Sequence, residues 1–155
     1  MYNRILVPIL HSGEVPSLMT EAAKICSSLR DASITLLHVE MPVHNAAVGT
    51  AFVTPTAVGV EEQVQEEGRL VLEQASRWLL EHKIEPTTVF KLGDPAHEIC
   101  RYAEEEHMDL IIVGQRDKGL LEKLLFGSVS QKVVKNAPSH VLVVKELQDE
   151  TKSSR

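Results

Sequence analysis

The sequence predicts an α/β domain in which a five-stranded parallel sheet is sandwiched by helices, and three observations lead to this fold class. Short apolar, β-branched runs recur along the chain, and segments with helical periodicity separate them. Hydrophobic residues make up 43% of the composition and aromatic residues only 4%, so the core must be aliphatic. The length of 155 residues fits one domain, which we expect over residues 1–146, with a polar tail at 147–155.

In the first half of the chain, proline and glycine positions help to define the elements. Pro8 must end the pairing of the first strand, because proline cannot donate to a sheet ladder. Pro16 suits the first turn of a helix, whereas Gly68 interrupts a long helix at a cost of about 1 kcal/mol relative to alanine. The predicted elements are a strand at 2–9, a helix at 16–29, a strand at 33–39, a long connection at 40–58 and a helix at 60–83.

The second half continues the alternation of strands and helices. Asp94 is predicted to be an N-cap and Pro95 the first helical residue. The predicted elements are strands at 87–91, 109–113 and 140–144 and helices at 95–106 and 128–135. In such folds ligands bind at the carboxyl ends of the strands, where the strand order switches. The loops after the first, second and fourth strands are therefore the place to look for a site.

A glycine loop follows the fourth predicted strand, and Gly127-Ser128 then leads into a helix. This order lets backbone approach a phosphate and directs N–H groups and the helix dipole towards it. The loop is not a Walker A motif, because no Gly-Lys-Ser/Thr stands at the required spacing, and the dinucleotide fingerprint belongs after a first strand. The alternative is that Gly127 makes an ordinary turn and Ser128 an ordinary N-cap.

Several separated segments resemble the universal stress protein family. They are Gly114-x2-Asp117-x9-Gly127-Ser128, the closing segment 137–144, the opening segment 4–9, and the segments 36–39 and 93–96. The resemblance covers nearly the whole chain, to about Lys145. It implies a Rossmann-like fold of the adenine nucleotide α hydrolase-like type. It also implies homodimers paired through the last strand and, in one branch, binding of ATP or another adenine nucleotide without an obligatory reaction.

The resemblance assigns roles to individual residues. The nucleotide-binding residues would be Val39, Gly114, Arg116, Asp117, Gly127, Ser128 and Val129, with Val39 meeting the adenine through its backbone, and with Pro8 and Leu10 lining the loop after strand one. Two positions depart from the nucleotide-binding pattern, which has a glycine at Asp117 and an aspartate at Leu10. A carboxylate about 5 Å from a phosphate charge costs on the order of 3 kcal/mol at an effective dielectric of 20. Arg116 and Lys118 could offset this cost, or Asp117 could hold Mg²⁺ shared with the phosphates.

Charge and composition exclude several other classes. A net charge of −6 argues against binding to nucleic acid or to an anionic membrane. No run of about 18 apolar residues is present, and no signal-peptide pattern opens the sequence, so we expect a cytoplasmic protein. Cys26 and Cys100 are expected to be buried, reduced thiols.

We expect neither catalytic residues nor a metal site formed by side chains. The histidines lack metal-ligand spacing. His11-Ser12 is discounted as a base and nucleophile because adjacent residues rarely present that geometry and no orienting acid is nearby. The chain is therefore predicted not to be an enzyme, and a slow ATPase has the least support.

Two functions remain open from the sequence. The first is a dimeric sensor or switch in the stress response that binds an adenine nucleotide, and the second is a dimeric interaction module of the same fold that binds none. In both, Val141 and Val143 are expected at a dimer edge, because an apolar strand at the edge of a sheet needs cover.

Overall fold

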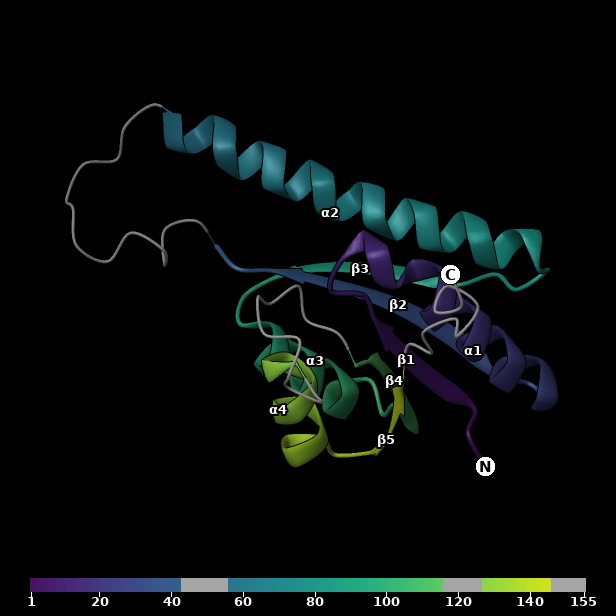
Figure 1. Cartoon of the computed structure of the whole chain (residues 1–155). Coiled ribbons are helices and arrows are strands. Elements are labelled where there is room, and N and C mark those ends of the chain that lie inside the picture. Colours follow the sequence, from purple (N-terminus) through teal and green to yellow (C-terminus); the bar gives the residue numbers. More distant parts are fainter. Residues whose placement is uncertain (43–55, 116–126, 146–155) are drawn as a thin grey trace, which may run out of the picture.

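A five-stranded parallel sheet, in the order β3-β2-β1-β4-β5, forms the centre of the computed structural model (Figure 1), which describes residues 1–42, 56–115 and 127–145. The strands are β1 (Arg4–Pro8), β2 (Ser33–Glu40), β3 (Thr87–Leu92), β4 (Leu110–Gly114) and β5 (His140–Val144). The helices are η1 (Ser12–Glu14, a 3-10 turn), α1 (Val15–Ser28), α2 (Thr56–Glu81), α3 (Pro95–Glu105) and α4 (Ser128–Asn136). The predicted fold class is confirmed.

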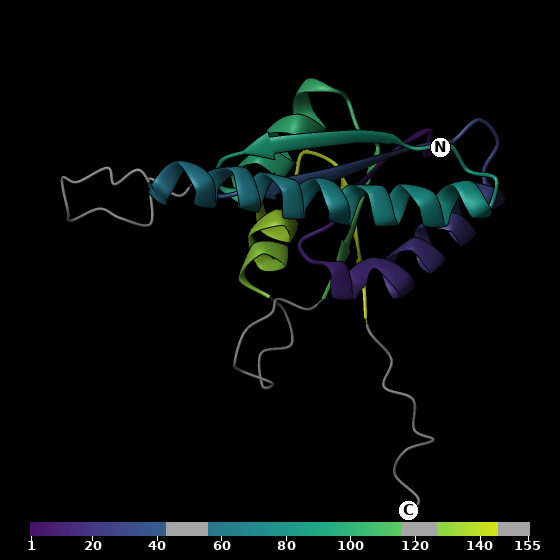
Figure 2. The same ribbon diagram turned by 90° about the horizontal axis from the view of Figure 1, so that it is seen from above.

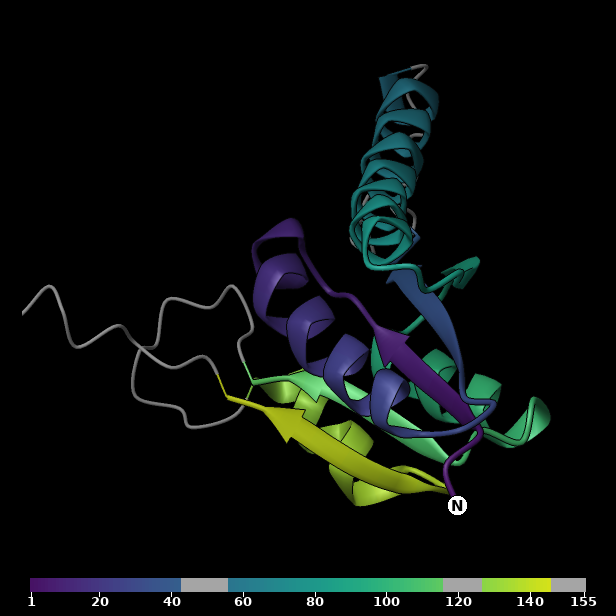
Figure 3. The same ribbon diagram turned by 90° about the vertical axis from the view of Figure 1, so that its right-hand side faces the viewer.

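The helices cover both faces of the sheet. Helices α1 and α2 lie on one face, and α3 and α4 lie on the other, as Figure 3 shows from the side; seen from above, α2 crosses in front of the strands (Figure 2). Successive residues of a strand point to opposite faces, so each face has its own core. In β1, Ile5 and Val7 join the cluster under α1 and α2, whereas Leu6 joins the cluster under α3 and α4.

The strand order switches between β1 and β4. β2 and β3 extend the sheet from one side of β1, and β4 and β5 extend it from the other, with all strands parallel. All five residues of β4 are buried, as its continuous apolar sequence predicts for a strand covered on both faces. Pro8 is the last residue of β1, where it lies opposite Leu37, so the predicted end of pairing is confirmed.

Some element boundaries differ from the predicted ones. β1 begins at Arg4 rather than residue 2. Helix α2 runs from Thr56 to Glu81 instead of 60–83, so its first turn takes up the end of the expected connection. Gly114 closes β4 rather than opening the following loop. Residues 43–55 of the connection, residue 146 and the predicted tail at 147–155 lie outside the described residues.

Two aspartates fix the ends of elements that follow loops. The Asp94 side chain accepts a hydrogen bond from the backbone N–H of His97 at 3.0 Å, which confirms the predicted N-cap of α3. Asp109 Oδ2 accepts hydrogen bonds from the backbone N–H groups of Asn3 and Arg4 at 2.9 and 2.8 Å. These two bonds, of which the one from Arg4 has the larger effect, hold the pKa of Asp109 below its ordinary value. They also tie the start of β1 to the start of β4.

Candidate functional site

At the carboxyl edge of the sheet between β1 and β4, the end of β4 meets the start of α4. The backbone N–H of Gly127 donates to the carbonyl of Gln115 at 3.0 Å, so the residues on either side of segment 116–126 meet. The Ser130 hydroxyl, fully buried in α4, donates to the carbonyl of Gly114 at 2.7 Å. These two bonds place the beginning of α4 directly beside the end of β4, at the switch point where α/β sheets bind ligands.

The predicted site residues of the first two strands reach the same edge. Leu10, Val39 and Val129 all belong to the hydrophobic cluster under α3 and α4. Val39 as a whole residue is only 5% exposed and pairs with Lys91 of β3, so its contact with a ligand through the backbone stays a prediction. Leu10 is half-buried against the same cluster, and Pro8 is buried in β1. Leu10 therefore contributes apolar packing where the family pattern has a carboxylate.

The start of α4 differs from the expectation that Ser128 is an ordinary N-cap. The N-cap is Gly127, in an extended conformation with no side-chain capping bond, and Ser128 is the first helical residue. The alternative in which Ser128 caps the helix is therefore wrong, because Gly127 already holds that position. Glycine at the cap leaves the approach to the first turn of α4 without a side chain. The predicted residues Arg116 and Asp117, with their neighbour Lys118, lie outside the described residues.

The sequence analysis missed a carboxylate at this edge. Glu14, the last residue of η1, is only 5% exposed and accepts a hydrogen bond from the backbone N–H of Leu10 at 2.9 Å. Its Oε1 lies 3.8 Å from Nε2 of His11, so the expectation that no acid lies near His11 is wrong. The 3-10 turn explains this contact, since it stacks residues three apart in the sequence.

The last strand forms the other edge of the sheet. Val141 and Val143, the expected dimer-edge residues, are half-buried against the cluster under α3 and α4. The exposed large apolar side chain of β5 is Leu142, at 38%. A contact through this edge would therefore use the β5 backbone and Leu142 more than the two valines.

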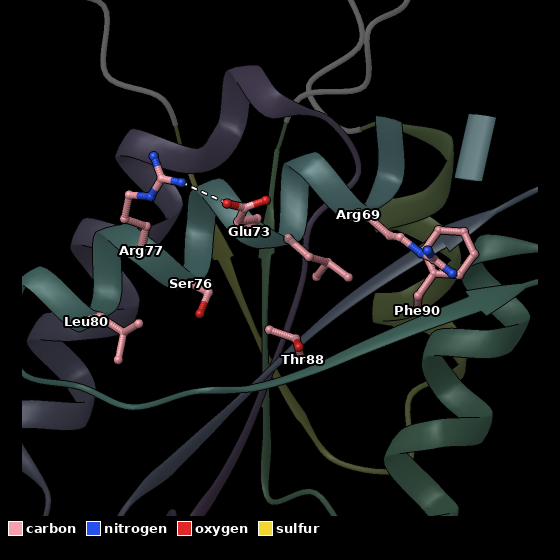
Figure 4. Close-up of a pocket in the computed structure, with 8 residues that line it drawn as sticks. Arg69, Glu73, Ser76, Arg77, Leu80, Thr88 and Phe90 are labelled. Carbon is pink, nitrogen blue, oxygen red and sulfur yellow. Dashed lines mark hydrogen bonds and ion pairs between the residues drawn. The ribbon is translucent and has the colours of Figure 1, made fainter. Parts of the chain in front are cut away.

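An open groove of about 560 Å³ lies between α2 and the opposite edge strand, β3 (Figure 4). Arg69, Arg77 and Glu73 of α2 face Thr88 and Phe90 of β3 across it. Arg77 is paired with Glu73 at 2.8 Å. This groove is two strands away from the switch point and shares none of the predicted site residues.

Metal and thiol chemistry find little support in the described part of the chain. No group of three His, Cys, Asp or Glu residues is placed there to hold a metal ion. Separately, none of the helices in this part of the chain is long and apolar enough to cross a membrane. Cys26 is buried as expected, but Cys100 is only half-buried. Burial raises the pKa of both thiols, which makes them poor nucleophiles at neutral pH.

Comparison with known proteins gives a consistent family. The model of the universal stress protein family matches residues 1–145. A universal stress protein of Bacillus subtilis is 30% identical over 94% of this chain and 100% of its own length. One from Methanothermobacter thermautotrophicus is 34% identical over 94% of this chain and 97% of its own.

Solved structures share the fold. A structure of a universal stress protein from Methanocaldococcus jannaschii matches with a TM-score of 0.79 and 26% identity, over 96% of this chain and 99% of that one. More distant structures are an Archaeoglobus fulgidus protein in complex with dAMP (TM-score 0.65, 20% identity, 93% and 98% covered) and an Arabidopsis thaliana protein with AMP bound (TM-score 0.67, 23% identity, 98% and 97% covered). With the family model spanning nearly its entire length and the fold in agreement, this chain belongs to the universal stress protein family.

Proposed function

We propose that this protein binds an adenine nucleotide at the carboxyl edge between β1 and β4 and acts as a sensor or switch in the stress response. The observation that carries the proposal is the junction of β4 and α4, where Gly114, Gln115 and Gly127 are held together by backbone and Ser130 hydrogen bonds. Such a junction presents backbone N–H groups and a helix N-terminus to an anion. The relatives with dAMP and AMP support adenine as the base.

In this proposal each end of the nucleotide has its own contacts. The Val39 backbone meets the adenine, and Gly114 allows close approach of the chain. Ser128 and Val129 hold the phosphates at the first turn of α4, and Gly127, whose own N–H is bonded to Gln115, leaves room for them. Arg116 and Asp117 complete the phosphate end, with Mg²⁺ as a bridge if Asp117 faces the phosphates.

Nucleotide binding is tested by thermal denaturation with and without AMP or Mg-ATP. A ligand that binds only the folded state at 100 times its Kd stabilises it by about 2.7 kcal/mol, which for a chain of this size raises the midpoint by roughly 5–10 °C. GTP at the same concentration controls for the base, and an Asp117→Gly variant reports on the phosphate end. If neither protein shows heat of binding or a shifted midpoint, nucleotide binding is excluded.

The interaction-module function is favoured by a specific observation, the apolar packing of Leu10 at the base end of the site. A shift that appears only in Asp117→Gly would support this function, because one carboxylate would then close an existing pocket to nucleotides. We propose no reaction for either function. Phosphate release above a buffer control from protein with bound ATP would contradict this.

We propose that the protein resides in the cytoplasm, where its two free cysteines would stay reduced. We also propose that two copies of the chain pair through β5. The second edge of β5 has no neighbouring strand within the described chain, and Leu142 is exposed beside it. Light scattering after size exclusion is expected to give a dimer for the native protein and a monomer for Leu142→Lys. Leu80→Lys, which alters a leucine of α2 that is more exposed, at 53%, should remain dimeric. A native protein that is monomeric at high concentration would contradict the pairing.

A further inference from the structure

The carboxylate of Glu14 occupies a fixed place at the switch point. Its Oε2 accepts the hydrogen bond from the Leu10 N–H, and the side chain is 4% exposed. The turn η1 positions it there, because this turn begins shortly after β1 ends and its last residue, Glu14, reaches back to the N–H of Leu10. A carboxylate held in this way does not sample solvent as a surface glutamate does.

The same carboxylate lies against Gly114. A Cβ added at Gly114 would meet Glu14 Oε1 at 2.6 Å, closer than real Cβ contacts come. Glycine at this position therefore makes room for the Glu14 side chain. From Gly114 the chain leads through Gln115 to its bond with Gly127, so the carboxylate borders the segment that carries the proposed phosphate contacts.

We propose that Glu14 selects among adenine nucleotides by their charge, so that this protein takes AMP in preference to ATP. The inference rests on the nucleotide site proposed above. ATP carries about two more negative charges than AMP at neutral pH. Each added charge is repelled by a buried carboxylate at the same edge of the sheet, and the repulsion grows with the number of phosphates. After screening by salt, we expect about a tenfold preference for AMP.

The test is calorimetric titration of AMP, ADP and ATP without Mg²⁺ into three proteins. They are the native protein, Glu14→Gln and Glu21→Gln. Glutamine keeps the size of the side chain and an acceptor for the Leu10 N–H while it removes the charge. Glu21 is the matched control, because it lies on α1 in an exposed pair with Lys24.

We expect the native protein and Glu21→Gln to bind AMP about tenfold more tightly than ATP, with ADP between them. In Glu14→Gln the affinity for ATP should rise to that for AMP, so that the preference is lost. Equal affinities in the native protein, or a preference that persists in Glu14→Gln, would overturn the inference and leave nucleotide binding intact. No binding of any adenine nucleotide to native protein or Glu14→Gln would overturn the proposed function itself.

A second measurement needs no variant. Raising the salt concentration screens the repulsion between Glu14 and the phosphates, so the ratio of ATP to AMP affinity in the native protein should increase. A ratio that falls with salt would mean that attraction to basic groups, not repulsion by Glu14, sets the preference, and would contradict the inference.

Discussion

Replacing Gly68 with alanine is expected to destabilise the protein by about 2 kcal/mol, although alanine is the better helix former by about 1 kcal/mol. Gly68 is buried in α2, where the helix crosses the sheet. A Cβ there would lie 2.5 Å from Phe90 Cε2 and 2.7 Å from His38 Cδ2. Two rings from neighbouring strands would have to move, and overpacking of this kind costs about 1–3 kcal/mol.

The same helix provides a matched control. Among the described residues, no atom outside the backbone of α2 lies within 4 Å of a Cβ added at Gly59, so Gly59→Ala should gain helix propensity without a clash. Urea denaturation is therefore expected to show Gly59→Ala stabilised by about 0.5–1 kcal/mol and Gly68→Ala destabilised. If Gly68→Ala were stabilised to the same extent as Gly59→Ala, the close contact of α2 with β2 and β3 would be refuted.

Gly68 illustrates what could be predicted from the sequence and what could not. Periodicity is a local property, and it was sufficient to place five strands and the helices between them. The sequence also marks Gly68 as an interruption of a long helix. The reason for it is a contact with His38 and Phe90, which become neighbours only when α2 packs across β2 and β3, and no local pattern contains that information.

The candidate site was predictable to the same extent. Gly114, Gly127 and Ser128 follow a buried strand and precede a helix, and the structure brings this junction to the switch point as expected. Glu14 was not predictable, because carboxylates are rarely buried and a glutamate beside a glycine usually signals a solvated turn. The weak signal was its position, four residues after Leu10, in the first loop that meets the site.

His38→Leu is expected to destabilise the protein by about 2–3 kcal/mol. His38 is 2% exposed, and its Nδ1 lies 2.6 Å from the carbonyl oxygen of Ile9. A carbonyl only accepts, so Nδ1–H donates this bond. Nε2 lies 2.7 Å from Glu40 Oε1. Leucine fills most of the ring volume but leaves the Ile9 carbonyl without this donor and Glu40 without its imidazole partner, and such losses cost about 1–3 kcal/mol each when buried.

Denaturation in urea gives the size of the effect, with His97→Leu as the control. His97 is exposed on α3, so its replacement should change the free energy of unfolding by less than about 0.5 kcal/mol. Equal effects of the two substitutions would show that the buried hydrogen bonds of His38 contribute nothing to stability.

The position of the Ile9 bond connects this stability effect to the site. His38 holds the carbonyl of Ile9, and Glu14 holds the N–H of Leu10, the next residue, so two side chains clamp the chain where it leaves β1. Loss of one clamp frees the loop that borders the nucleotide site, and ordering it again costs free energy on binding. His38→Leu should therefore weaken AMP binding as well as folding, whereas Gly59→Ala, whose added Cβ meets no described atom, should leave AMP binding unchanged. If His38→Leu bound AMP with unchanged affinity, the loop after β1 would be shown not to contribute to nucleotide binding.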